Sequence, residues 1–286
     1  MMISPQTPSS IEPALDLTTY DETFGNRPGA LVRPVAFVEA RMGSTELPGR
    51  ALLPILGRPL LWHVIDRVRQ ASQIAEVVVL TTDSPRDMPI RSYCRRQGIE
   101  VFAGNERDAT DRLYRAAIHY RANPIVRLEA EAAFVDPTLV DRLLSLYSDG
   151  EFDYARIATG AGSIFLEGGR YPEGMGAQVI GLHALERTWS EATDANDRGA
   201  VTAFVERAVG RFRVGTLRAE QNLSHLRLTI ENEGDLELAR QVYGQLGSSR
   251  GAFTLEQTLA FLNSRPELLG LARRFSGAEA FQPLAA

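Results

Sequence analysis

Lysine is absent from the 286 residues, so all 31 basic side chains are arginines. This absence excludes a lysine Schiff base, a lysine phosphate ligand and a lysine general base. Acidic residues number 36, and the net charge of -5 argues against binding to nucleic acid, which needs a basic face.

Cysteine occurs once, at Cys94, within a segment of helical pattern. A single thiol cannot form a disulfide within the chain, which favours a reducing cytoplasm. We expect Cys94 to be a half-buried helical thiol, with a reactive thiol as the alternative. Apolar runs of 18 or more residues are also absent, and the N-terminus lacks a basic patch followed by an apolar core. Neither a membrane span nor a signal peptide is predicted.

What is present is the composition of a globular protein, 44% hydrophobic and 23% charged. Residues 1–30 are rich in Pro, Ser, Thr and acids and lack apolar periodicity, so we expect a mobile tail there. A second tail is expected at 276–286. The body, 31–275, has a length that suits one large α/β domain.

Short apolar runs alternate with amphipathic segments along the first half of this body. Strands are predicted at 35–38, 76–82, 99–103 and 125–128, and helices at 60–70, 88–97 and 111–120. This alternation predicts a parallel, doubly wound sheet in a three-layer α/β/α fold. His63 and His119 fall within helical patterns and are expected on helix faces rather than as metal ligands.

A glycine-containing loop with two arginines follows the first strand. It reads RMGSTELPGR, from Arg41 to Arg50. Guanidiniums and exposed backbone N–H groups beyond the carboxyl end of a strand favour a polyphosphate site. The alternative is an ordinary strand-to-helix loop with two solvated arginines.

The loop resembles the nucleotide-binding loop of sugar-acid cytidylyltransferases, in particular the SpsF-like branch related to CMP-KDO synthetases. Arg41 to Gly49 matches at every position except Glu46, where an arginine is usual, and Arg50 replaces the usual lysine. The resemblance implies a nucleotide-diphospho-sugar transferase-like, Rossmann-like fold and transfer of a cytidylyl group from CTP to a sugar acid.

The resemblance also implies a Mg²⁺ site. The stretch RLEAEAAFVDP, from Arg127 to Pro137, is similar to the family's R-I-T-G-D-C-P-L-I-D-P, in which the aspartate binds Mg²⁺. Glu131 takes the place of that aspartate. Glu129 is a further candidate oxygen ligand, because residues alternating along a strand share a face, as Glu129 and Glu131 would. Asp136, which the family pattern keeps, is another. The alternative is a strand end with solvated acids.

Other stretches depart from the family pattern at its acids. In YPEGMGAQVI, Gly176 and Gln178 replace two acidic residues, and the stretch 198–204 has lost its acid, histidine and proline. The stretch 226–240 keeps the pattern R-x-T-V-D-x-x-E-D-L-E-x-x-R with Glu231 for the aspartate and Gly234 for a glutamate. Three functions therefore stay open: a cytidylyltransferase of surface-polysaccharide or glycan biosynthesis, a catalytically inactive nucleotide-binding regulator or scaffold, and a glycosyltransferase.

The candidate site residues follow from the loop and the resemblance. Arg41 and Arg50 are the predicted catalytic cations, and Glu131 is the predicted metal ligand. The predicted nucleotide-binding residues are Ala40, Arg41, Met42, Gly43, Ser44, Thr45, Arg50, Thr82, Asp83, Asp111 and Arg127. The loops at 81–85 and 104–111 should border the base and ribose.

Residues 151–172 interrupt the alternation with glycines and isolated apolar residues, including Ile157, Ile164 and Phe165. The resembled family inserts a dimer-forming arm in this region. We therefore expect a homodimer whose contact covers these residues, with a surface flap over the acceptor as the alternative.

Overall fold

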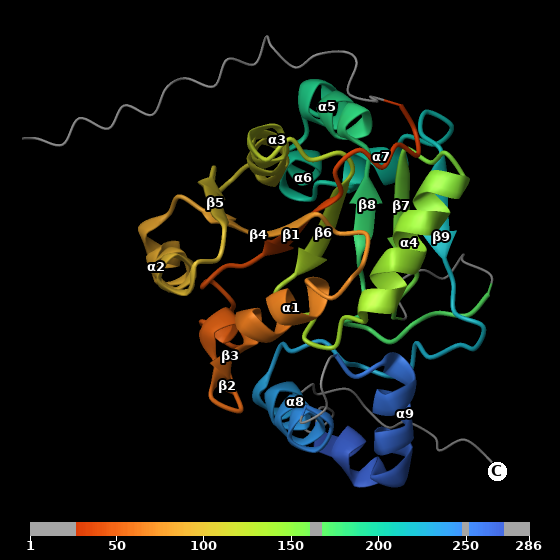
Figure 1. Cartoon of the computed structure of the whole chain (residues 1–286). Coiled ribbons are helices and arrows are strands. Elements are labelled where there is room, and N and C mark those ends of the chain that lie inside the picture. Colours follow the sequence, from red (N-terminus) through yellow and green to blue (C-terminus); the bar gives the residue numbers. More distant parts are fainter. Residues whose placement is uncertain (1–26, 161–167, 248–251, 272–286) are drawn as a thin grey trace, which may run out of the picture.

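A seven-stranded sheet forms the centre of the computed structural model, which describes residues 27–160, 168–247 and 252–271 (Figure 1). Its strands, in spatial order, are β5 (Val101–Gly104), β4 (Glu76–Thr82), β1 (Val35–Glu39), β6 (Ile125–Glu129), β8 (Gln178–Ile180), β7 (Tyr154–Ile157) and β9 (Val214–Leu217). β8 is antiparallel to β6 and β7, and the other pairs are parallel. The predicted fold class, a mostly parallel α/β sheet, is confirmed.

Helices cover both faces of the sheet because the central strands are apolar on both sides. In β1, Ala36 and Val38 join one core cluster, and Val35 and Phe37 join the other. The first cluster contains residues of α1 (Leu60–Val68), α2 (Met88–Gln97), α4 (Pro137–Asp149), α8 (Glu233–Leu246) and α9 (Leu255–Ser264). The second contains residues of α3 (Ala109–His119), α5 (Leu182–Glu191) and α7 (Ala203–Arg207). The three-layer arrangement is the one that the sequence predicts.

The C-terminal helices lie below the sheet in Figure 1, next to the small hairpin of β2 (Pro54–Ile55) and β3 (Arg58–Pro59). Arg67 of α1 holds this layer in place. Arg67 as a whole is 3% exposed, and its guanidinium donates to the backbone oxygens of Val135 and Phe253, each at 2.7 Å. One buried side chain thereby joins α1, the segment after β6 and the segment before α9.

The predicted helices and strands of the first half are present, with ends that differ by one or two residues. The apolar face of 60–70 is buried as α1, Cys94 is fully buried, and His63 lies on a helix face with its Nε2 2.8 Å from the Ile55 oxygen. Cys94 is therefore more deeply buried than the sequence predicts. Among the described residues no helix is long and apolar enough to cross a membrane.

Two expectations about irregular segments change. The predicted tail reaches residue 30, yet Ala30 is buried and the Gly29 amide donates to the Phe152 oxygen at 3.0 Å. The predicted arm 151–172 begins with strand β7, whose Ile157 is 5% exposed and packs in the core of the chain itself. Residues 1–26 and 276–286 of the predicted tails, and Ile164 and Phe165 of the arm, lie outside the described residues.

Candidate functional site

The loop from Arg41 to Arg50 leaves β1 at the carboxyl edge of the sheet. Its backbone folds back on itself, since the amides of Ser44 and Gly49 both donate to the Met42 oxygen, at 3.1 and 3.0 Å. Gly49 has φ 71°, a conformation that favours glycine. Within the part of the chain that the structure describes, the amides of Gly43 and Thr45 donate to no protein acceptor. Free amides in an exposed loop can bind phosphate oxygens.

Asp87 anchors this loop to the neighbouring strand connection. Asp87 as a whole is 3% exposed, and its carboxylate accepts hydrogen bonds from the Met42 amide at 2.8 Å and the Thr82 hydroxyl at 2.5 Å. Thr82, a predicted nucleotide-binding residue, therefore uses its hydroxyl within the protein. The adjacent Asp83 keeps an exposed side chain, while its amide donates to the Gly104 oxygen at 2.8 Å. Thr82 thus binds Asp87, which fixes the loop, and Asp83 faces solvent at the same edge of the sheet.

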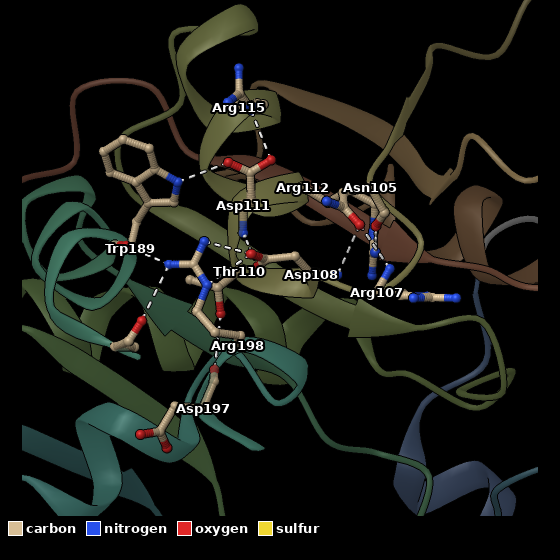
Figure 2. Close-up of polar contacts among 11 residues, drawn as sticks. Asn105, Arg107, Asp108, Thr110, Asp111, Arg112, Arg115, Trp189, Asp197 and Arg198 are labelled. Carbon is tan, nitrogen blue, oxygen red and sulfur yellow. Dashed lines mark hydrogen bonds and ion pairs between the residues drawn. The ribbon is translucent and has the colours of Figure 1, made fainter. Parts of the chain in front are cut away.

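The connection after β5 is ordered by Asn105, whose side-chain oxygen accepts the amides of Arg107 and Asp108 at 2.9 and 3.2 Å. Asp108 caps α3 and also accepts Arg198 at 2.8 and 2.5 Å (Figure 2). The short helix of Arg198, α6 (Ala195–Gly199), is thus fixed to this connection.

Asp111, predicted to bind nucleotide, has its partners inside the protein. Figure 2 shows its carboxylate directed at Trp189 and Arg115, with hydrogen bonds of 2.9 and 2.8 Å. Burial opposes ionisation of Asp111, but these two donors hold its pKa below the ordinary value. The hydrogen bond to Trp189 joins α3 to α5, so the carboxylate of Asp111 serves the packing of these helices.

Beneath the loop, Glu39 at the end of β1 is surrounded by arginines. Arg127 of β6 donates to its two oxygens at 2.5 and 3.2 Å. Burial would raise the pKa of Glu39, yet the charges of Arg127, Arg112 and Arg41 lower it overall. Arg112 is 1% exposed, and its Nε has no partner among the described residues. Three arginines thus surround one carboxylate at the point where the loop leaves β1.

Arg50 and Glu131 form an ion pair across 81 positions of sequence, with side chains 21% and 17% exposed. The sequence predicts that Arg50 binds phosphate and that Glu131 binds a metal. Burial lowers the pKa of Arg50, and the carboxylates of Glu231, Glu129 and Glu46 oppose that shift. The structure therefore brings the predicted phosphate cation and the predicted metal ligand to one point.

Beside this ion pair lies a cavity of about 360 Å³, bordered by β6, β7, β8 and the segments before β8 and α8. Three backbone hydrogen bonds assemble its far wall. The Glu173 amide donates to the Leu226 oxygen at 3.0 Å, the Leu228 amide to the Glu173 oxygen at 2.7 Å, and the Ile230 amide to the Glu131 oxygen at 3.2 Å.

Gly174 allows this close approach of the two segments. Its φ is 91°, and a Cβ there would lie 2.3 Å from the Thr229 nitrogen, closer than real Cβ contacts. The cavity lining as a whole is Arg127, Leu128, Glu129, Ala132, Arg156, Ile157, Ala158, Thr159, Glu173, Gly174, Gly176, Ala177, Gln178, Thr229 and Glu231.

The predicted residues thus separate into two groups. The structure places Ala40 to Thr45, Arg50, Asp83 and Glu131 around the loop, while Thr82, Asp111 and Arg127 make contacts within the protein. Sequence reasoning missed Glu39, Asp87, Arg112 and Glu173. The family stretch YPEGMGAQVI contains Glu173, but the sequence gives no sign that this residue borders a cavity.

A family model described as cytidylyltransferase matches residues 35–242. The chain therefore belongs to the cytidylyltransferase family, and the family expected from the loop is confirmed. The chain is similar to the spore coat polysaccharide biosynthesis protein SpsF of Bacillus subtilis (strain 168). The two are 28% identical over 237 residues, which cover 80% of this chain and 94% of SpsF.

Solved structures show the same fold. A cytidylyltransferase from Leptospira borgpetersenii has a TM-score of 0.74 and 23% identity, over 87% of this chain and 99% of the other. A CMP:2-keto-3-deoxy-manno-octonic acid synthetase, solved as a complex with CTP, has a TM-score of 0.53 and 19% identity, over 74% of this chain and 99% of the other. At these identities the structural likeness concerns the fold.

Proposed function

We propose that the chain transfers the cytidylyl group of CTP to a hydroxyl of a sugar-like acceptor, with release of pyrophosphate, in surface-polysaccharide or glycan biosynthesis. One observation carries the proposal. The arginine-bearing loop after β1, with its free amides, is joined by the Arg50–Glu131 ion pair to a segment that borders a cavity of about 360 Å³, within the usual range for small-molecule sites. Membership of the cytidylyltransferase family supports CTP as the donor.

The chain's own residues would act mainly by binding and by charge. In nucleotidyl transfer the acceptor oxygen forms a bond to the α-phosphorus, and the bond from that phosphorus to the bridging oxygen of pyrophosphate breaks. Arg41, Arg50 and the amides of Gly43 and Thr45 would hold the triphosphate. Their positive charge and N–H groups would stabilise the negative charge on the leaving pyrophosphate.

A divalent cation fits the residues present. Glu131 and Glu231 offer carboxylate oxygens on segments joined by the Ile230–Glu131 hydrogen bond, and both lie near Arg50. The residues that the structure describes hold no group of three or more His, Cys, Asp or Glu side chains arranged for a metal. Mg²⁺ commonly takes one or two carboxylates together with substrate phosphates, so we expect it to bind only with nucleotide. When bound it would neutralise phosphate charge.

Pyrophosphate release from CTP, UTP, ATP and GTP, with Mg²⁺ and a panel of sugar acids, neutral sugars and amino sugars, tests the proposal. We expect release from CTP alone. Equal use of the four nucleotides would refute the cytidylyl assignment and leave the fold unaffected.

Two further measurements, CTP binding and nucleoside diphosphate release, separate the other two functions. CTP binding without turnover of any acceptor would make the chain a nucleotide-binding regulator or scaffold. Release of a nucleoside diphosphate from a nucleotide sugar would make it a glycosyltransferase.

A further inference from the structure

The cavity beside Arg50 presents unbalanced negative charge to its ligand. Its lining contains three glutamates, Glu129, Glu173 and Glu231, and two arginines, Arg127 and Arg156. The balance of charge depends on which of these side chains already have a partner in the protein.

Both arginines are already paired. Arg127 donates two hydrogen bonds to Glu39 and a third, at 2.8 Å, to the side-chain oxygen of Gln178. Arg156 lies 2.9 Å from Glu206, although its buried Nε has no partner among the described residues. Each guanidinium therefore has a carboxylate partner before a ligand arrives, although Arg127 shares Glu39 with Arg112 and Arg41.

The three glutamates have fewer hydrogen-bond and ion-pair partners than the two arginines. Glu129 and Glu173 are exposed, and neither makes a hydrogen bond or ion pair through its carboxylate within the described part of the chain. Glu231 shares Arg227, at 3.2 Å, with the buried Asp235, at 2.6 Å. Two free carboxylates consequently face the cavity.

The pKa of Glu173 reports the same imbalance. Partial removal from solvent raises it, and the carboxylates of Glu231, Asp235 and Glu129 raise it further, while Arg227 opposes them. Three carboxylates and one guanidinium, that of Arg227, therefore act on Glu173, and its pKa lies above the ordinary value. A positively charged group in the cavity would add a second cation beside Glu173.

We propose that this cavity selects an acceptor bearing an amine, such as an amino sugar, over a sugar acid. The inference rests on the proposed function, since it names the acceptor class of that same site. An ammonium can pair with Glu173 and Glu129, whereas a carboxylate would lie near two like charges without a free guanidinium. Thr159, Thr229 and Gln178 supply the polar atoms for sugar hydroxyls.

A metal held by Glu131 and Glu231 would not reverse this preference, because the carboxylates of Glu129 and Glu173 would still have no hydrogen-bond or ion-pair partner among the described residues. The amine preference departs from what the resemblance to sugar-acid cytidylyltransferases implies.

Glucosamine, glucose and glucuronate provide a matched test, because they share a hexose ring and differ in charge. Their affinities are measured by ligand-observed NMR titration of the full chain with Mg²⁺ and saturating α,β-methylene-CTP, which cannot transfer its nucleotidyl group. A pH of about 6.5 keeps the amine protonated. We expect glucosamine to bind about tenfold more tightly than glucuronate, the scale of one charge-assisted contact, with glucose between them.

Glu173→Gln should reduce this preference to about threefold, because Glu129 still faces the cavity. A threefold preference is half of the difference in binding free energy between glucosamine and glucuronate that a tenfold preference represents. Glu256→Gln is the matched control, since Glu256 is exposed on α9 away from the cavity, and it should keep the wild-type preference. Retained binding of the CTP analogue shows that each variant is folded.

Equal or tighter binding of glucuronate, or no binding of any of the three sugars, would overturn the inference while CTP binding and turnover leave the proposed function in place. A Glu173→Gln variant that alters only the Mg²⁺ requirement would also overturn it, because the carboxylates would then serve a cation. Failure of the wild type to bind the CTP analogue would instead refute the proposed function, and the inference with it.

Discussion

The ion pair between Arg50 and Glu131 makes one substitution act in opposite directions on binding and turnover. Glu131→Gln keeps the shape of the side chain and removes its charge. If Arg50 binds phosphate, CTP must first displace Glu131 from it, and in the variant that competition is gone. We therefore expect tighter CTP binding without metal, and loss of Mg²⁺-dependent pyrophosphate release.

The size of the gain follows from the burial of the pair. The side chains are 21% and 17% exposed, between the surface case, worth about 0–1 kcal/mol, and the buried case, where loss of one partner costs about 3–5 kcal/mol. About 1–2 kcal/mol is reasonable here, because Glu129 and Glu231 still act on the freed Arg50. This corresponds to about 5–30-fold in affinity.

Calorimetry with CTP in EDTA measures the first effect, and pyrophosphate release with Mg²⁺ measures the second. Glu46→Gln is the charge-matched control: it removes one exposed carboxylate near Arg50 and breaks no ion pair, so its effect on affinity should be smaller. Unchanged or weaker CTP binding in Glu131→Gln would refute the competition, and full Mg²⁺-dependent turnover would show that Glu131 is not the metal ligand.

Three further predictions concern the loop, a buried histidine and the oligomeric state. Arg41→Ala should lose about 1–3 kcal/mol of CTP affinity by calorimetry, while the exposed Arg95→Ala control loses none; equal losses would remove Arg41 from the site. Burial lowers the pKa of His63, so its contribution to stability is present above its unfolded pKa of about 6.5 and is lost as the pH falls through the folded value. His63→Gln should flatten that slope in urea unfolding between about pH 7 and 5, and an unchanged slope would assign it to other groups. Sedimentation at micromolar concentration should show a dimer, and a monomer alone would contradict the predicted arm contact.

The sequence by itself was sufficient for the architecture of the first half. Its strands are runs of apolar residues and its helices have a clear apolar face, so the alternation of 35–128 predicts a parallel sheet with two helical layers. Strands β7, β8 and β9 were missed because three or four residues are too short to show a period and, unlike the equally short β5, they lie outside the regular alternation of the first half. Ile157 is buried in the chain's own core, whereas the sequence pattern predicts that a dimer contact covers it.

The phosphate loop was found from its residues, but the partners of its side chains could be known only from the tertiary structure. Arg50 meets Glu131 because the carboxyl ends of β1 and β6 are adjacent in the sheet, although the residues are far apart in sequence. Glu173 reaches the cavity because Gly174 lets its segment lie against 226–230. A sequence shows which charges a chain carries, whereas the fold decides which of them neutralise one another and which remain free for a ligand.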